Sequence, residues 1–179
     1  DFEVSTASKS AFNQGTLTVS GDLIQTQDNM DFSNYYTVTL NGTEKQTINL
    51  PYVDQIGYLD LRKSAGVHLK QNLEGTYLYG IEKVIVSDRF TSLYNNNDVC
   101  SDGTLNGDVT CIGRLYVNNY DLKVNGDFQQ RDDVSLGKGK LEVGGNYTAS
   151  SGTLWLEEGK IHVHGNTNIK AKAMLSMKE

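Results

Sequence analysis

The sequence predicts an all-β fold, a parallel β-helix (β-solenoid) with about 20 residues per coil. A phrase of the form apolar-x-Val-x-Gly-Asp/Asn occurs at 17–22, 122–127, 141–146 and 161–166. The last three copies begin about 20 residues apart, which is too short for a domain and suits one coil of a solenoid. The chain has 18 glycines and one proline, so its many turns depend on glycine, asparagine and aspartate.

Each phrase is expected to be one strand of a coil. Period-two alternation places Leu141 and Val143 inside and Glu142 outside. We expect the repeated strands to stack in one sheet and the helix to be right-handed. A β-sandwich is the main alternative, because it explains the turn spacing, but it does not explain the recurring phrase.

The Gly-Asp/Asn pair that ends each phrase is expected to form a corner. Glycine permits a positive φ, and an Asp or Asn side chain can hydrogen-bond to local backbone. Because Asp alternates with Asn at this position, we interpret it as turn geometry rather than as a chemical site. The expected corner residues are Gly21, Asp22, Gly126, Asp127, Gly145, Asn146, Gly165 and Asn166.

The repeat pattern predicts a single solenoid domain over residues 1–179, with irregular insertions near 44–56 and 94–113. Leu175 and Met177 follow Leu154 and Leu156 by 21 residues, so a further coil begins there. Solenoid ends usually carry an atypical polar capping repeat, and none is visible. We therefore expect a fragment of a longer repeat array, with Leu175 and Met177 at an edge available for assembly.

Composition narrows the range of partners. The chain has 16 Lys and Arg against 22 Asp and Glu, a formal net charge of −6. No stretch gathers the basic residues into one face, so we expect no nucleic-acid partner. No apolar run is long enough to span a bilayer, so we expect no membrane insertion.

A resemblance adds a functional expectation. The phrase at 38–48, then Leu59-Asp60-Leu61 and Gly66-Val67, followed by the Leu-x-Val-x-Gly-Asp coils, resemble repeat arrays of very large secreted bacterial proteins. Their general design is similar to filamentous-haemagglutinin-type adhesin stalks. The resemblance implies a non-catalytic structural or adhesive segment of an extracellular or cell-surface fibre protein, able to assemble end to end. Its partners would be neighbouring repeats, a second copy, or surface glycans. The alternative function is a polysaccharide-binding or polysaccharide-cleaving β-helix.

Two cysteines, Cys100 and Cys111, lie in the predicted second insertion. Their spacing fits no zinc pattern. A disulfide between them would close a loop of roughly a dozen residues and stabilise the fold by about 3 kcal/mol. The exported character implied by the resemblance favours this disulfide over two unpaired thiols.

We expect no enzyme, because no catalytic motif is present, and no cofactor. Asp98 and Asp102 could contribute to a calcium site, although their spacing departs from the EF-hand loop. His162 and His164 share an outward face and could share a metal, although we favour an ordinary surface ladder of Lys, Glu and His side chains, because no third ligand is evident. Tyr77 and Tyr79 alternate on one strand and suit either sugar rings or packing against a neighbouring rod.

Overall fold

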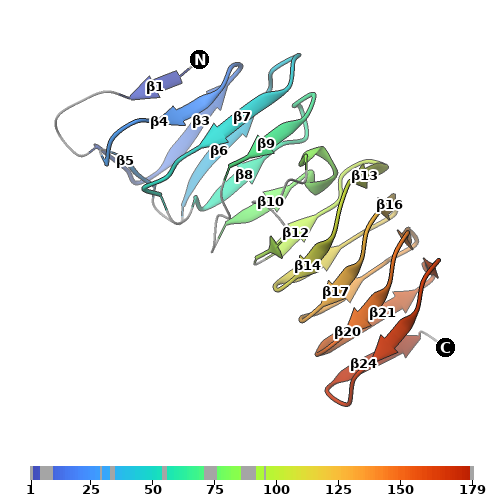
Figure 1. Cartoon of the computed structure of the whole chain (residues 1–179). Coiled ribbons are helices and arrows are strands. Elements are labelled where there is room, and N and C mark those ends of the chain that lie inside the picture. Colours follow the sequence, from blue (N-terminus) through green and yellow to red (C-terminus); the bar gives the residue numbers. More distant parts are fainter. Residues whose placement is uncertain are drawn as a thin grey trace.

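The chain winds into a parallel β-solenoid of about 7 turns whose repeats lie ~20 residues apart (Figure 1). The computed structural model describes residues 2–4, 10–28, 30–32, 35–53, 56–70, 76–85, 92–94 and 96–177. Every strand pair within these ranges is parallel. The predicted solenoid is therefore confirmed, and a sandwich built from antiparallel hairpins is excluded.

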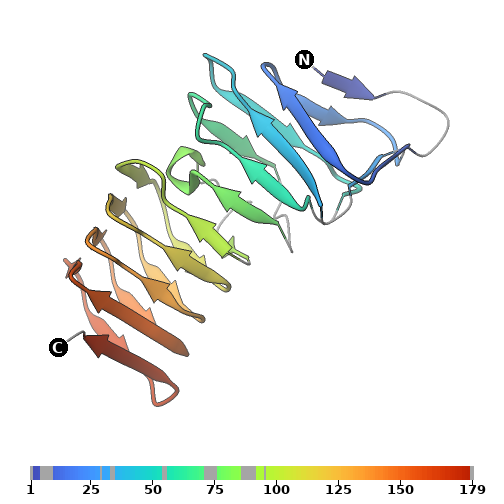
Figure 2. The ribbon, with the colours of Figure 1, turned by 180° about the vertical axis from the view of Figure 1, so that it is seen from behind.

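One nine-stranded sheet, called the long sheet, runs along the whole rod. Figure 2 shows the rod from behind, with its strands following one another in colour order from the N-terminal to the C-terminal end. Residues paired on adjacent strands are separated by 18 residues at Asn96↔Arg114 and by 21 at Leu154↔Leu175. The strands are β3 (Gly15–Val19), β6 (Tyr36–Leu40), β8 (Tyr58–Asp60), β10 (Tyr77–Tyr79), β12 (Asn96–Asp98), β15 (Arg114–Tyr116), β18 (Val134–Ser135), β21 (Gly152–Glu157) and β24 (Ala173–Met177).

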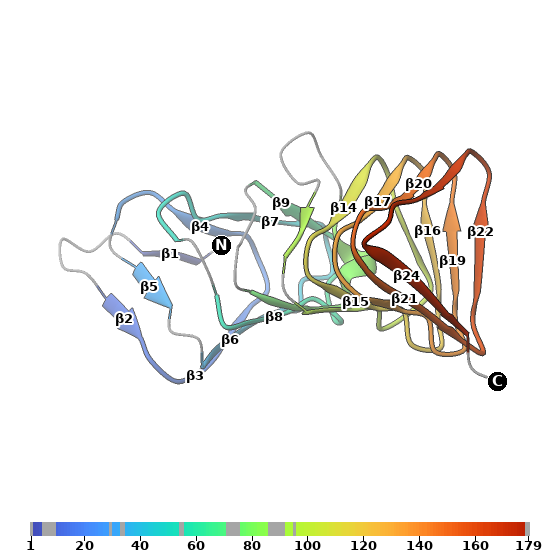
Figure 3. The same cartoon turned by 90° about the horizontal axis from the view of Figure 1, so that it is seen from below.

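Shorter sheets form the other sides of the rod, and the C-terminal coils are three-sided in end view (Figure 3). The repeat sheet holds β13 (Gly103–Leu105), β16 (Asp121–Val124), β19 (Lys140–Val143) and β22 (Lys160–Val163). The polar sheet holds β11 (Ser92–Leu93), β14 (Val109–Cys111), β17 (Phe128–Gln130), β20 (Tyr147–Ala149) and β23 (Thr167–Ile169). The N-terminal sheet holds β1 (Phe2–Val4), β4 (Leu23–Gln25), β7 (Gln46–Asn49) and β9 (Val67–Leu69).

Two smaller elements complete the N-terminal half. Strands β2 (Ser10–Phe12) and β5 (Met30–Phe32) pair with each other. A single 3-10 turn, η1 (Ile81–Lys83), precedes Val84, which bridges to Val67 of β9. None of the helical segments in the described ranges has the length and apolarity needed to cross a membrane.

The core is built from columns of apolar side chains that stack from coil to coil. Leu122, Leu141 and Ile161 are in register on the repeat sheet, and Leu122 and Leu141 are almost fully buried. Alternate residues point into the coil because successive strand side chains face opposite sides. Burial of one such leucine contributes about 1.5–3 kcal/mol. The predicted inward placement of Leu141 and Val143 is confirmed.

The first copy of the repeated phrase lies on a different sheet from the others. The three later copies stack on the repeat sheet as β16, β19 and β22, and Leu105 of β13 joins them opposite Val124. Leu17 instead lies in β3 of the long sheet, opposite Val38. The expectation of a single sheet is thus wrong for this copy. Here the phrase leads from the long sheet into the N-terminal sheet, whereas the later copies lead from the repeat sheet into the polar sheet.

The two predicted insertions are wrong. Within 44–56, β7 pairs with β4 and β9, and Ile48 and Leu50 are fully buried. Within 94–113, strands β12, β13 and β14 supply the three sides of an ordinary coil. In the sequence, the alternation of apolar and polar residues is interrupted at this coil, because the polar residue Asn97 is fully buried at an inward position. Its Nδ2 donates a hydrogen bond to the Arg114 carbonyl at 3.0 Å.

Candidate functional site

The Gly-Asp/Asn corners of the later copies hydrogen-bond between coils. The Oδ1 of Asp108 accepts the backbone N–H of Asp127 at 2.8 Å. The Oδ1 of Asp127 in turn accepts the N–H of Asn146 at 2.7 Å, and Oδ1 of Asn146 accepts that of Asn166 at 2.9 Å. At the first copy, Asp22 Oδ1 accepts the N–H of Thr47 at 2.7 Å. These corner side chains therefore join successive coils, in place of the local backbone bonds expected from the sequence.

The corner glycines of the three later copies are required by close approach rather than by a positive φ. Gly126, Gly145 and Gly165 are absent from the described residues with positive φ. A Cβ built on Gly145 would lie 2.2 Å from Asp127 Oδ1 and 2.9 Å from the backbone nitrogen of Asp127, so both the side chain and the backbone of the neighbouring coil would have to move. The backbone N–H of Gly145 also donates to the Gly126 carbonyl at 2.9 Å. Glycine is thus the residue that lets the corners stack.

Cys100 and Cys111 are free thiols, so the predicted disulfide is not formed. Cys111 is fully buried on β14 of the polar sheet, and its Sγ donates to the Gly113 carbonyl at 2.8 Å. Cys100 follows β12 on the long sheet and is half-buried. The two side chains therefore belong to different sides of the coil. Burial raises the pKa of both thiols.

Asp98 and Asp102 hydrogen-bond to the next coil. Asp98 Oδ1 accepts from the amide of Asn118 at 3.4 Å, and Asp102 Oδ1 accepts the N–H of Asp121 at 2.8 Å. In the ranges that the structure describes, no group of three His, Cys, Asp or Glu side chains could hold a metal ion.

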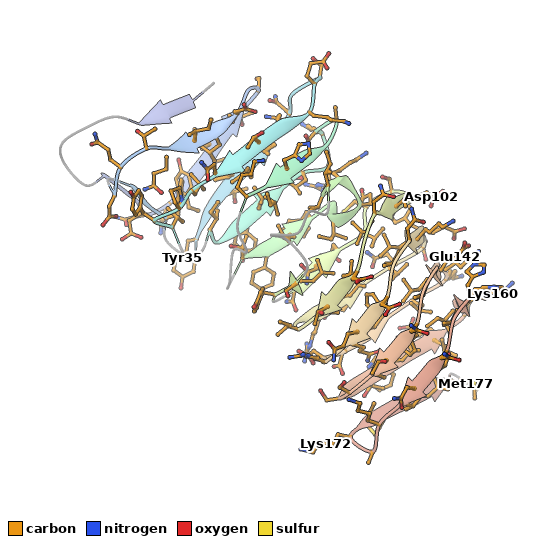
Figure 4. The ribbon with its side chains drawn as sticks, viewed as in Figure 1. Tyr35, Asp102, Glu142, Lys160, Lys172 and Met177 are labelled. Carbon is orange, nitrogen blue, oxygen red and sulfur yellow. The ribbon has the colours of Figure 1, made fainter. Side chains whose placement is uncertain are left out.

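A charged cluster centred on Glu142 covers the outer face of the repeat sheet. Figure 4 shows Asp102, Glu142 and Lys160 along one side of the rod. Glu142 contacts Lys140 Nζ at 2.5 Å, Lys123 Nζ at 3.4 Å and His164 Nε2 at 3.3 Å. Hydrogen bonds from Lys140, then from His164, lower the pKa of Glu142 to about 2.

His162 and His164 are part of this charged ladder. His162 lies opposite Glu142 in the sheet register, and its ring centroid is 4.5 Å from that of His164. Both side chains are exposed, His162 on β22 and His164 directly after the end of that strand.

Aromatic rings gather on the outer face of the long sheet, in the N-terminal half. Tyr58 pairs with Tyr77, and their ring centroids are 5.3 Å apart. Tyr58 and Tyr79 are stacked, with centroids 6.3 Å apart and ring planes 15° apart. A concavity of about 470 Å³ opens here, called the tyrosine groove and lined by Thr37, Tyr58, Asp60, Arg62 and Tyr79.

An ion pair is fixed beside these rings. Arg62 donates from Nε to Asp60 Oδ1 at 2.9 Å and from Nη2 to Asp60 Oδ2 at 2.8 Å. Its guanidinium carbon is 5.6 Å from the centroid of the Tyr79 ring, within the range of a cation–π contact. The side-chain hydrogen bond lowers the pKa of Asp60 and raises that of Arg62.

Sequence reasoning found Tyr77 and Tyr79 but missed Tyr58 and the Asp60–Arg62 pair. The available signal was the coil period, because Tyr58 precedes Tyr77 by 19 residues and is its partner in register. A single tyrosine between glycine and leucine shows no local pattern of its own.

The C-terminal coil exposes a leucine whose partner one coil earlier is buried. Leu175 is 53% exposed, whereas its partner Leu154 is 3% exposed. Met177, labelled in Figure 4, is 69% exposed and follows Leu175 by two residues on β24. Strand β24 is the last strand of the long sheet, so within the described residues its outer edge pairs with no other strand. The coil end therefore presents apolar side chains and a sheet edge together.

Searches with protein-family models, against curated proteins and against solved structures each found no match.

Proposed function

We propose that the chain is a non-catalytic structural and adhesive segment of an extracellular or cell-surface bacterial fibre protein. The observation that carries the proposal is the long sheet, whose nine parallel strands continue from β3 to β24 in one ladder. Backbone hydrogen bonds in such a ladder run along the rod axis, so a pull along the axis loads many of them together. A rod of this kind can hold two ends at a fixed separation.

The corner ladder supports the same role. Each bond from one corner side chain to the next backbone N–H joins two coils, at 2.8 Å, 2.7 Å and 2.9 Å in succession. These bonds lie on a side of the rod other than the long sheet. Coils tied on more than one side resist bending as well as extension.

The exposed C-terminal coil supports end-to-end assembly. An unpaired strand edge is a template for another strand, and the apolar side chains beside it gain by leaving water. Leu175 and Met177 supply these side chains. The occupant that fits is a further coil, from neighbouring repeats or from a second copy of the chain.

Light scattering over a range of protein concentrations tests this assembly. We expect the purified chain to grow in mass with concentration, and Leu175→Asp to suppress the growth by placing a charge at the coil end. Ser176→Asp is the matched control, since Ser176 is the next residue of β24 and lies on the opposite face. A chain that stays monomeric at every concentration, or equal effects of the two variants, would contradict assembly through this end.

Antibody labelling of intact and permeabilised cells tests the proposed location. We expect intact producing cells to be labelled without permeabilisation. Labelling confined to permeabilised cells would contradict an extracellular or cell-surface role.

A second candidate function is polysaccharide binding or cleavage, and the tyrosine groove favours the binding part. Exposed aromatic rings beside fixed polar groups are typical of ligand-binding surfaces. A reducing-sugar assay separates the two activities, because cleavage of a glycosidic bond creates new reducing ends whereas binding does not.

A further inference from the structure

We propose that the tyrosine groove binds an uncharged oligosaccharide chain laid along the rod axis. The proposal rests on the adhesive part of the proposed function and names its ligand class and residues. The rings of Tyr58, Tyr77 and Tyr79 cluster on two neighbouring strands, β8 and β10, on the outer face of the long sheet.

The rings offer an apolar surface of the right kind. Tyr77 is 37% exposed, and Tyr58 and Tyr79 are half-buried, so ring surface is open to solvent while the backbone holds it in place. The faces of sugar rings carry C–H groups that pack on aromatic faces, and tyrosine adds a hydroxyl at the wet edge. Neighbouring strands are about 4.8 Å apart, a separation comparable to the length of one sugar ring.

The Asp60–Arg62 pair supplies the polar side of the site. A carboxylate accepts and a guanidinium donates, so the pair can meet neighbouring hydroxyl groups of one sugar. Two hydrogen bonds at 2.9 Å and 2.8 Å already hold the guanidinium. Arg62 nevertheless keeps 57% of its side chain exposed. Because the side chain is ordered before ligand arrives, binding loses less conformational entropy.

The charges of the groove favour an uncharged ligand. The positive charge of Arg62 is matched by Asp60. Asp98 pairs with Tyr79 on the next strand and adds a negative charge there. Binding of an acidic polysaccharide would need positively charged side chains that are not already paired with a carboxylate. None of the residues that line the groove is of this kind.

The binding surface continues along the rod. A second concavity of about 340 Å³ lies on the same side and shares Tyr77 with the first group of rings. Its lining includes Tyr94, Asn96 and Arg114, and Asn96 and Arg114 are partners on β12 and β15. The path therefore extends over four neighbouring strands, from β8 to β15. This length suits a chain of several sugars better than a single one.

The other outer faces are less suited to sugar rings. The concavity on the polar sheet is lined by polar side chains such as Asp108 and Thr148, and its one ring, Phe128, is 1% exposed. The concavity on the repeat sheet is lined by the charged side chains around Glu142 and contains no ring. Exposed rings and a fixed polar pair meet at the tyrosine groove.

A glycan array followed by calorimetric titration of the best ligand tests the proposal. We expect binding to uncharged oligosaccharides and a loss of affinity of about tenfold or more in Tyr77→Ala. The Tyr77 ring packs against Tyr58 of the groove and lines the second concavity, so its removal affects both parts of the binding surface. Tyr77→Phe keeps the ring and should retain most of the affinity. Tyr120→Ala is the matched control, because Tyr120 is also 37% exposed but lies outside both concavities. Circular dichroism checks that each variant is folded.

The array also carries acidic glycans, and a proline-rich peptide is titrated in parallel, since such peptides also dock on aromatic grooves. The proposal is overturned by no glycan binding, by binding restricted to acidic glycans or the peptide, or by equal losses in Tyr77→Ala and Tyr120→Ala. Light scattering of Tyr77→Ala and glycan titration of Leu175→Asp separate the hypothesis of sugar binding from that of end-to-end assembly. We expect the first variant to assemble normally and the second to bind sugar normally, so failure of one hypothesis is visible without failure of the other.

Discussion

The backbone N–H of Asn146 donates to Oδ1 of Asp127 at 2.7 Å, although the two residues lie 19 positions apart in the sequence. Asn146 then accepts from the N–H of Asn166 through its own Oδ1 at 2.9 Å. An aspartate and an asparagine thus perform the same task on successive coils. Oδ1 is the atom they share, which explains why the position alternates between the two residue types.

Removing this acceptor should weaken the rod. We expect Asp127→Ala to lower the free energy of unfolding by about 1 kcal/mol, because the Asn146 N–H loses its protein partner. Asp127→Asn keeps Oδ1 and should stay within about 0.5 kcal/mol of the parent chain. Urea unfolding monitored by circular dichroism measures both variants. Equal destabilisation by the two substitutions would mean that the carboxylate charge, and not the acceptor, matters at the corner.

A column of left-handed residues turns the chain from the long sheet into the repeat sheet. Asn118, Gly137 and Glu157 occupy successive coils with φ of 63°, 59° and 52°. A glutamate in this region is strained by its Cβ, at a cost of about 1–2 kcal/mol. We expect Glu157→Gly to raise the urea midpoint.

Glu158→Gly is the control for this substitution, because Glu158 follows directly but has no positive φ. At position 158, glycine loses more backbone freedom on folding than glutamate does, which should lower the free energy of unfolding by about 0.5–1 kcal/mol. If both glycine variants lowered the midpoint, strain at Glu157 would not be the controlling factor.

The Glu142 cluster predicts a specific loss of stability in acid. The pKa of Glu142 is about 2 in the fold, against 4.5 for an unperturbed glutamate. A lowered pKa means that the contribution of the ionised group is complete above about pH 4.5 and disappears as the pH falls toward 2. We expect Glu142→Gln to flatten this part of the curve of thermal midpoint against pH.

Glu158→Gln tests whether any surface carboxylate has this effect. Glu158 makes an exposed contact with Lys138 at 3.3 Å, and such pairs contribute little. Its curve should follow that of the parent chain between pH 7 and pH 2. A parent-like curve for Glu142→Gln would contradict the role of the cluster.

The two thiols should differ in reactivity. Cys100 is half-buried, whereas Cys111 is fully buried and hydrogen-bonded to the Gly113 carbonyl. We expect a thiol reagent to label Cys100 in the native protein and Cys111 after unfolding, because thiolate formation and access are both suppressed by burial. Mass spectrometry without reductant measures the outcome. An unlabelled protein lighter by two hydrogens would indicate a disulfide instead.

Much of the fold could be predicted from the sequence because most inward positions are apolar. Leu141 and Val143 alternate with outward residues, and the phrase that contains them recurs at the coil period. The coil at 94–113 escaped prediction because Asn97 occupies an inward position. A buried amide whose Nδ2 donates to a backbone carbonyl looks, in the sequence, like part of a polar loop.

The candidate site was harder to predict because it is assembled across coils. Tyr58 and Tyr77 meet through strand register, and the Asp60–Arg62 pair lies at the end of β8, where Asp60 is the last residue of the strand. No short motif records such a neighbourhood. The corner residues were identified, but their partners one coil away depend on stacking that the local sequence does not specify.

The spacer role and the tyrosine groove both depend on one claim, that the coils stack in register along a single axis. Thr18, Tyr116, Ser135 and Trp155 belong to one outward column of the long sheet. Pulsed electron paramagnetic resonance measures this stacking as the distance between two spin labels. One label is placed at Thr18→Cys and the other at a cysteine introduced at one of the other three positions. The native cysteines are removed by Cys100→Ser and Cys111→Ala. We predict distances of about 24, 29 and 34 Å, rising by about 4.8 Å for each strand crossed. Distances that do not increase in this order would contradict the in-register rod.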